Sequence, residues 1–165
     1  PGLGLGVPAS PRDAVALGAT VLCGGEAEIR GNYIPPTVLV GVTHAMKIMR
    51  EETFGPIVAI QRVGSEAEAI RLVNDSEYGL SAGVWTQDAQ QAFDIAEQLE
   101  AGMVWINDWH VAPPQYPFGG VKQSGLGREG GPDALDEYTE PKVISFDLSG
   151  GIDGKAYAMV LGTPN

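Results

Sequence analysis

The chain has 165 residues, with 10 basic against 21 acidic side chains, a formal net charge of −11 and a pI near 4.4. This acidity argues against a nucleic-acid backbone or an anionic membrane surface as the partner, because both require clustered positive charge. Hydrophobic residues at 44% and charged residues at 19% are typical of a folded, soluble protein, and 23 Gly with 12 Pro predict many turns and loops.

The few cysteine and histidine residues limit the chemistry further. A single cysteine, Cys23, excludes an intramolecular disulfide and a multi-cysteine zinc site. With His44 and His110 as the only histidines, we expect no metal. No apolar run is long enough to span a bilayer and no secretory signal opens the chain, so we expect a reduced, cytoplasmic setting. The chain starts at Pro1 without methionine, which we interpret as a processed or partial sequence.

The first part of the chain is irregular. Residues 1–17 form a lead-in rich in Gly and Pro, with a short helix predicted at Asp13–Leu17. Extended segments are predicted next at 19–23, which the glycine pair 24–25 ends, and at 33–34 and 37–42.

The middle of the chain has the clearest pattern, beginning with a strand and a helix. Ile57–Val63 is a short apolar run rich in β-branched residues, which indicates a buried strand. Ser65 is placed to cap a helix over Glu66–Val73, with Glu68 at the capping-box position. Asp75 marks the exit from this helix.

Two more strands follow, with a second helix between them. Ser81–Thr86 and Met103–Ile106 are the strands, and Asp88 caps the helix that Gly102 ends. The apolar residues of this helix fall on one face: Ala89, Ala92, Phe93, Ala96 and Leu99. Alternating strands and helices with short connections predict an α/β fold, with a parallel sheet that has helices on both faces.

A loop of about 20 residues, Asn107–Arg128, leaves the last of these strands, and loops of this length are typically functional. In open α/β sheets the functional crevice lies beyond the carboxyl ends of the strands, where this loop begins. Beyond it we predict a helix at Pro132–Tyr138, an alternating strand at Lys142–Leu148 and a tail over 149–165.

Two segments are candidates for ligand binding. Glu51–Pro56 precedes a buried strand and presents a carboxylate and an aromatic ring, either to a ligand or as an incidental surface turn. Tyr116–Glu129 contains four glycines but lacks the order of a phosphate-binding loop. It is either a ligand-site loop or a flexible surface hairpin.

Several sequence blocks in a fixed order resemble the aldehyde dehydrogenase superfamily: EETFGPIVAI, YGLSAGVWT, GMVWIN and PFGGVKQSGLGRE. The resemblance covers roughly residues 18–148 and corresponds to the carboxyl-terminal part of a family subunit. It implies that residues 18–141 are part of the catalytic domain. It also implies that residues 142–148 are the strand through which subunits assemble, by pairing with a neighbour's sheet edge.

The resemblance also implies site residues. Glu52 matches the glutamate that binds the hydroxyls of the nicotinamide ribose, and Phe54 the ring beside the nicotinamide, so the cofactor would be NAD or NADP. The residues that match the wall of the aldehyde entrance are Trp109, Val111, Ala112 and Phe118. Trp109 resembles the aromatic residue of members that take betaine-like or amino-aldehydes, where an indole engages a cation; the alternative is a plain hydrophobic wall.

The side chains that carry out the family's chemistry precede this sequence: a cysteine nucleophile, an asparagine of the oxyanion hole and a glutamate base. No catalytic residue is therefore expected in this chain. Cys23 follows the catalytic portion and is expected to be buried and structural. His110 is interpreted as a wall or solvent residue, and His44 is expected to be exposed.

The resemblance implies an oxidoreductase that converts an aldehyde to a carboxylic acid with NAD(P) through a cysteine thioester. This chain carries only the carboxyl-terminal part and would be inactive alone. The alternative is a non-catalytic assembly or regulatory fragment that pairs with a full-length dehydrogenase, and a third is a truncated product without activity. The expected partners are a small aldehyde and further subunits, as a homo-oligomer or with a dehydrogenase subunit.

Overall fold

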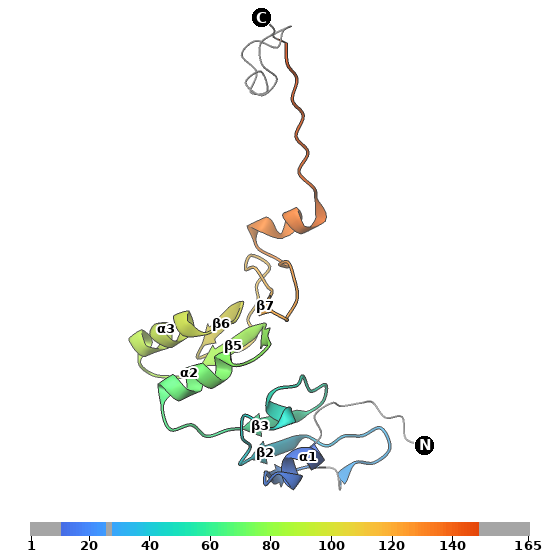
Figure 1. Ribbon diagram of the computed structural model, residues 1–165, viewed down its shortest axis with the longest axis vertical. Helices are drawn as coiled ribbons and strands as arrows, with labels where there is room; N and C mark the ends of the chain where they lie inside the picture. Colours follow the sequence, from blue (N-terminus) through green and yellow to red (C-terminus); the bar gives the residue numbers. More distant parts are fainter. Residues whose placement is uncertain (1–10, 26–27, 149–165) are drawn as a thin grey trace, which may run out of the picture.

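The computed structural model describes residues 11–25 and 28–148; the rest of the predicted lead-in and the tail over 149–165 lie outside the described residues. Figure 1 shows the elements in chain order. They are α1 (Pro11–Ala16), β1 (Thr20–Cys23), β2 (Thr37–Val40), the 3-10 helix η2 (Lys47–Met49), β3 (Ile57–Ile60), α2 (Glu66–Asn74), β4 (Tyr78–Gly79), β5 (Ser81–Val84), α3 (Ala89–Gln98), β6 (Met103–Ile106), β7 (Val121–Lys122) and the 3-10 helix η3 (Pro132–Tyr138).

The first sheet has the order β1-β2-β3 and packs one face against a small core. β1 runs antiparallel to β2, and β2 runs parallel to β3 with Leu39 opposite Ala59. The core consists of α1, the inner face of the sheet and the segment around η2: Ala14, Ala19, Leu39, Val42 and Met46. Because side chains alternate along a strand, Val58 and Ile60 lie on the other face, where both are exposed.

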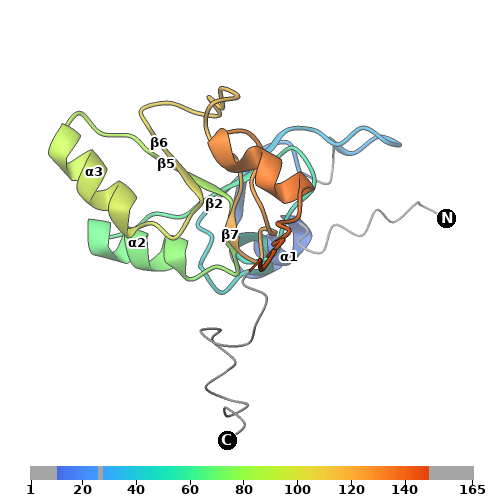
Figure 2. The ribbon, with the colours of Figure 1, turned by 90° about the horizontal axis from the view of Figure 1, so that it is seen from above.

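The second unit is a parallel pair, β5 and β6, connected through α3. α2 and α3 lie side by side in both views of the ribbon (Figures 1 and 2). Two hydrogen bonds join them: Asn74 Nδ2 donates to the Gln98 carbonyl at 2.7 Å, and Gln91 Nε2 donates to Glu66 at 2.7 Å. Ala92 is the residue of α3 that is buried.

The predicted starts of α2 and α3 are confirmed, whereas α1 begins at Pro11, two residues before the predicted Asp13. Ser65 Oγ accepts a hydrogen bond from the Glu68 amide at 3.2 Å, and Asp88 Oδ1 accepts one from the Gln91 amide at 3.1 Å. Each satisfies an amide that the first helical turn leaves without a backbone partner. The Glu68 carboxylate accepts from the amide of Gly64 rather than from that of Ser65, so the capping box is shifted by one residue.

The α/β class is confirmed, but the sheets are mixed. We predicted one parallel sheet over the three central strands; the structure pairs β3 with β2 and β5 with β6 instead. β3 is apolar along its whole length, so its sequence fits either neighbour and does not determine its partner. In the described part of the chain, α2 and α3 lie together rather than on opposite faces of one sheet (Figure 2).

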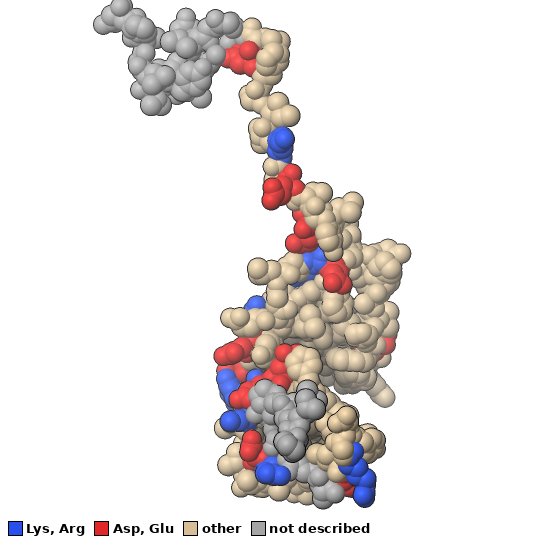
Figure 3. All heavy atoms as spheres, turned by 90° about the vertical axis from the view of Figure 1, so that its right-hand side faces the viewer, with Lys and Arg blue, Asp and Glu red and all other residues tan. Residues whose placement is uncertain are grey.

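The chain leaves the folded body after η3, which is the predicted helix in 3-10 form. Residues 141–148 are extended and pair with no strand of the described residues, and Figure 3 shows them standing away from the rest. Their apolar side chains are each more than four-fifths exposed: Val143, Ile144, Phe146 and Leu148. Strand formation here stays a prediction, because its expected partner is another chain. Across residues 11–25 and 28–148, every helix is too short or too polar to cross a bilayer.

Candidate functional site

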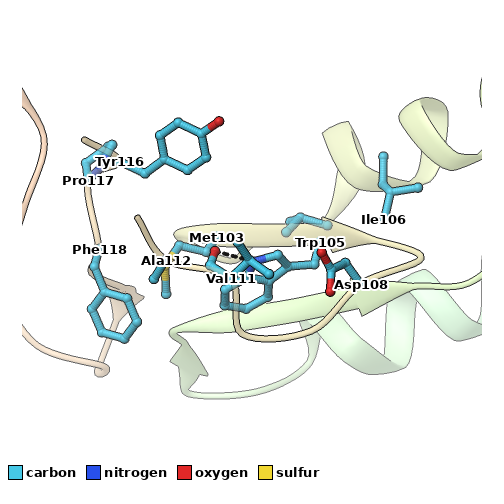
Figure 4. Close-up of a pocket in the computed structure, with 10 residues that line it drawn as sticks. Met103, Trp105, Ile106, Asp108, Val111, Ala112, Tyr116, Pro117 and Phe118 are labelled. Carbon is cyan, nitrogen blue, oxygen red and sulfur yellow. Dashed lines mark hydrogen bonds between the residues drawn. The ribbon is translucent and has the colours of Figure 1, made fainter. Parts of the chain in front are cut away.

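A cleft of about 440 Å³ opens between β6 and the loop that follows it. Figure 4 shows the residues that line it, nearly all apolar or aromatic: Met103, Val104, Trp105, Ile106, Asp108, Val111, Ala112, Tyr116, Pro117 and Phe118. Asp108 contributes a carboxylate to this wall. The cleft combines an apolar surface with few polar groups, which is the usual composition of a small-molecule site.

Asn107 starts the loop by fixing the end of β6 to the end of β5. Its side-chain oxygen accepts from the Thr86 amide at 2.9 Å, and its side-chain nitrogen donates to the Thr86 carbonyl at 2.8 Å. Its backbone is left-handed, with φ of 54°, which asparagine tolerates better than most residues. The chain therefore turns sharply out of the sheet at this point.

An aromatic cluster of Trp105, Trp109, His110 and Phe118 forms beside the cleft. The Trp105 and Trp109 rings are 5.4 Å apart and tilted by 55°. The His110 ring lies 6.2 Å from that of Trp105, 6.4 Å from that of Trp109 and 6.5 Å from that of Phe118. These separations are within the range of favourable aromatic contacts, so the loop presents a joined aromatic surface.

The glycine-rich segment, residues 118–129, packs closely against the start of β6. The Phe118 and Glu129 backbones exchange hydrogen bonds of 2.6 and 2.8 Å, which close this segment. A Cβ at Gly102 would collide with the Gly119 carbonyl oxygen, so the start of β6 and the Gly119 backbone approach more closely than any side chain permits. The segment is thus packed against the sheet, which the hairpin alternative did not predict.

The structure brings together some of the predicted site residues. Val111, Ala112 and Phe118 line the same cleft, and Trp109 contacts Trp105 on its wall. Sequence reasoning missed Trp105 and Asp108. Asp108 directly precedes the predicted Trp109, and Trp105 lies within the block GMVWIN.

Glu52 and Phe54 lie elsewhere, in the turn before β3. Among the described residues, no hydrogen bond or ring contact links them to the aromatic cluster. The Phe54 side chain is 78% exposed and the Glu52 side chain is also exposed, while the Thr53 hydroxyl between them is buried with no hydrogen-bond partner in the structure.

A polar cluster outside the cleft corrects one expectation. His44, predicted to be exposed, has a side chain only 17% exposed, and its Nε2 lies 2.8 Å from Asp75 Oδ2. Arg50 donates to the same carboxylate oxygen at 3.1 Å. The hydrogen bond from Arg50, followed by that from His44, holds the pKa of Asp75 below its ordinary value.

Cys23 corrects another expectation. It is exposed rather than buried, because β1 is an edge strand of its sheet in the described chain and Cys23 is its last residue. No group of three or more His, Cys, Asp or Glu side chains suited to a metal occurs within the described ranges.

Comparison with protein families matches residues 8–144 to the model described as "Aldehyde dehydrogenase family". A non-phosphorylating aspartate-semialdehyde dehydrogenase from Halomonas elongata is 44% identical over 143 residues, which is 86% of this chain and 29% of that protein. A betaine aldehyde dehydrogenase from Cereibacter sphaeroides is 46% identical over 132 residues, 79% of this chain and 27% of its own length.

Solved structures are similar as well. The betaine aldehyde dehydrogenase of Staphylococcus aureus superimposes with a TM-score of 0.72 at 44% identity, covering 77% of this chain and 26% of that one. An indole-3-acetaldehyde dehydrogenase of P. syringae, in complex with NAD+, gives a TM-score of 0.74 at 41% identity over 78% of this chain and 27% of that chain. The chain thus spans less than a third of the length of these relatives.

Proposed function

Because the chain belongs to the aldehyde dehydrogenase family, we propose that it forms the carboxyl-terminal part of an enzyme that oxidises an aldehyde to a carboxylic acid with NAD(P). The observation that carries this proposal is the apolar cleft beyond β6, which Val111, Ala112 and Phe118 all line. Such a wall excludes water from an aldehyde and orients its tail. In this proposal the nucleophile, the oxyanion donor and the base come from the part of the enzyme that this chain does not contain.

The composition of the cleft favours aldehydes with a positively charged tail. Trp105 and Trp109 supply aromatic faces that attract a cation, and Asp108 adds a carboxylate on the same wall. Two of the similar proteins are named for betaine aldehyde, which fits this chemistry. A neutral aldehyde that only packs on the wall is the second candidate, and the indole-3-acetaldehyde dehydrogenase favours it.

The turn before β3 fits a nicotinamide cofactor. The exposed Glu52 carboxylate is able to accept hydrogen bonds from two neighbouring ribose hydroxyls, and the exposed Phe54 ring offers a face to the nicotinamide. When bound, the cofactor supplies the acceptor for the hydride that leaves the substrate carbon. Six of the similar structures contain NAD+, which supports this assignment.

Residues 142–148 are proposed to pair with the sheet edge of a neighbouring subunit, giving a homo-oligomer. Their extended backbone and exposed apolar side chains are those of a segment suited to strand addition. We also infer a cytoplasmic location, from the single cysteine and the soluble composition.

The test is a chimera of the Halomonas elongata relative in which this chain replaces the region it matches. We expect aldehyde-dependent NAD(P)H formation by the chimera and none by this chain alone. Glu52→Gln should lower kcat/KM by about 10- to 100-fold, the value of a lost hydrogen bond to a charged group. Glu51→Gln, in the same turn, is the matched control.

An inactive but folded chimera would contradict the proposal. Binding of this chain to an intact dehydrogenase without any gain in activity would favour the assembly or regulatory alternative. Equal kinetics for Glu52→Gln and Glu51→Gln would remove Glu52 from the cofactor site.

A further inference from the structure

A stretch of five residues, 107–111, is anchored to the sheet at both of its ends. Asn107 holds the first end through its two hydrogen bonds to the Thr86 backbone. The second end is held by Trp105, whose indole nitrogen donates to the Val111 carbonyl at 2.9 Å, drawn as a dashed line in Figure 4. The loop therefore folds back over the strand from which it emerges.

The backbone of this stretch has an uncommon conformation. Of the described non-glycine residues, three have positive φ, and two of them, Asn107 at 54° and His110 at 63°, lie in this stretch. Left-handed conformations of non-glycine residues persist where surrounding contacts impose them, and they gather at functional sites. The hydrogen bonds of Asn107 to Thr86 account for its own conformation. His110 lies immediately before Val111, whose carbonyl accepts the hydrogen bond from Trp105.

We propose that Trp105 is a positioning residue, whose indole N–H holds the Val111 carbonyl and thereby sets Val111 on the wall of the cleft and Trp109 beside it. The identity of the cleft as an aldehyde site rests on the proposed function, whereas the anchoring itself is independent of it. Trp105 has two roles in this arrangement. The centre of its ring lies 5.4 Å from that of Trp109, and its indole nitrogen donates a hydrogen bond to the carbonyl of Val111.

A purely structural role would need only the ring. Trp105 is half-buried on β6, so an aromatic side chain there packs against its neighbours whether or not it carries an N–H group. Trp105→Phe keeps a ring and removes the donor, which leaves the Val111 carbonyl without its partner. If Trp105 only packs, Trp105→Phe should leave the loop in place; if its N–H positions the loop, the same variant should release it.

The first measurement uses the chain itself, labelled with ¹⁵N at the tryptophan indoles. The sequence has three tryptophans, and single Trp→Phe variants assign the three indole N–H signals. Trp85 and Trp109 are more than half exposed, and neither indole nitrogen has a hydrogen-bond partner in the described chain. We expect the Trp105 N–H to exchange with water at least about tenfold more slowly than those of the other two.

The second measurement compares Trp105→Phe with Trp85→Phe as the matched control. We expect only Trp105→Phe to make the Trp109 indole more mobile in ¹⁵N relaxation, because only it releases the loop. The chemical shift of Trp109 does not decide this, since replacing a ring 5.4 Å away changes the ring current there in either case. In the active chimera, the same variant should raise KM several-fold with little change in kcat, since it loosens the binding wall and leaves the reacting groups in place.

Similar exchange rates for the three indoles would overturn the proposal, even if Trp105→Phe failed to fold. If the Trp105 N–H is protected but the Trp109 indole stays equally rigid in Trp105→Phe, the hydrogen bond does not position the loop, and the proposal is also overturned. An inactive chimera would contradict the proposed function, and the two NMR measurements on the chain itself would still decide the role of Trp105.

Discussion

The ammonium group of Lys122 lies 2.6 Å from Oε2 of Glu100. The same nitrogen donates to the Asn74 carbonyl at 2.7 Å and to the Ser76 carbonyl at 3.1 Å, at the end of α2. Lys122 has a left-handed backbone with φ of 56°, in β7 just beyond the glycine pair that supports Phe118. One side chain thus joins the glycine-rich segment to the ends of both helices.

Two substitutions of Lys122 should separate the stability that its side-chain contacts contribute from the cost of its left-handed backbone. Lys122→Ala loses all three interactions and is expected to lower the free energy of unfolding by about 1.5–3 kcal/mol, the value of hydrogen bonds to a charged group. Lys122→Gly loses the same interactions but relieves a left-handed conformation that costs about 1–2 kcal/mol. The glycine variant should therefore be the more stable of the two in urea unfolding followed by circular dichroism.

Lys142→Ala serves as the control, because Lys142 lies in the extended exposed segment, where a change within about 0.5 kcal/mol is expected. A glycine variant less stable than the alanine variant would show that Lys122 is not strained.

Gly102→Ala should disturb the support of the cleft. A Cβ at this position meets the Gly119 carbonyl oxygen and lies 2.9 Å from the Gly120 Cα, both of which are backbone atoms that yield only if the loop moves. We expect a loss of about 1–3 kcal/mol in unfolding free energy, as for overpacked sites. Gly55→Ala, where the Cβ would enter open space, should be neutral or slightly stabilising. Equal stability of the two variants would contradict this close approach.

The sequence predicted those features that depend on neighbouring residues. Ser65 and Asp88 were identified as caps because capping is a contact within one helical turn. The pairing of β3 with β2 was missed, since it depends on contacts between distant segments. Lys122 and His44 were missed for the same reason: Glu100 and Asp75, their charged partners, are 22 and 31 residues away along the chain.

For the site, the resemblance pointed to the loop that lines the cleft and to three residues that share it. It did not reveal the anchors of that loop, Trp105 and Asn107. Both bind backbone groups, which nearly every residue has, so the sequence of the partner segment does not indicate the hydrogen bond.

Asp75 should make the fold sensitive to acid. Its pKa is lowered in the folded state by Arg50 and then His44, so the folded state binds its proton less readily than the unfolded state does. The stability it contributes is complete above its ordinary pKa of 3.8 and is lost as the pH falls through the lower folded value. We expect Asp75→Asn to flatten the fall of Tm below about pH 4.

Asp133→Asn, on the exposed start of η3, is the control and should keep the parental pH profile. If both variants retain the full acid sensitivity, the Arg50–Asp75–His44 cluster does not contribute to it.

The segment 142–148 provides the sharpest test of assembly. Strand addition uses backbone N–H groups, so proline within the segment should weaken it, whereas alanine at the same site should not. Ser145→Pro and Ser145→Ala form a matched pair at the centre of the exposed apolar residues. The measurement is the mass of the assembled protein, by light scattering after size exclusion. We expect Ser145→Pro and the deletion of residues 142–165 to lower this mass, and Ser145→Ala to leave it unchanged. An unaltered mass after the deletion would contradict the role in assembly. The exposed apolar side chains of this segment would then be assigned to a contact within the larger enzyme. Apolar side chains such as Phe146, which is 83% exposed, are seldom left in water along a whole segment.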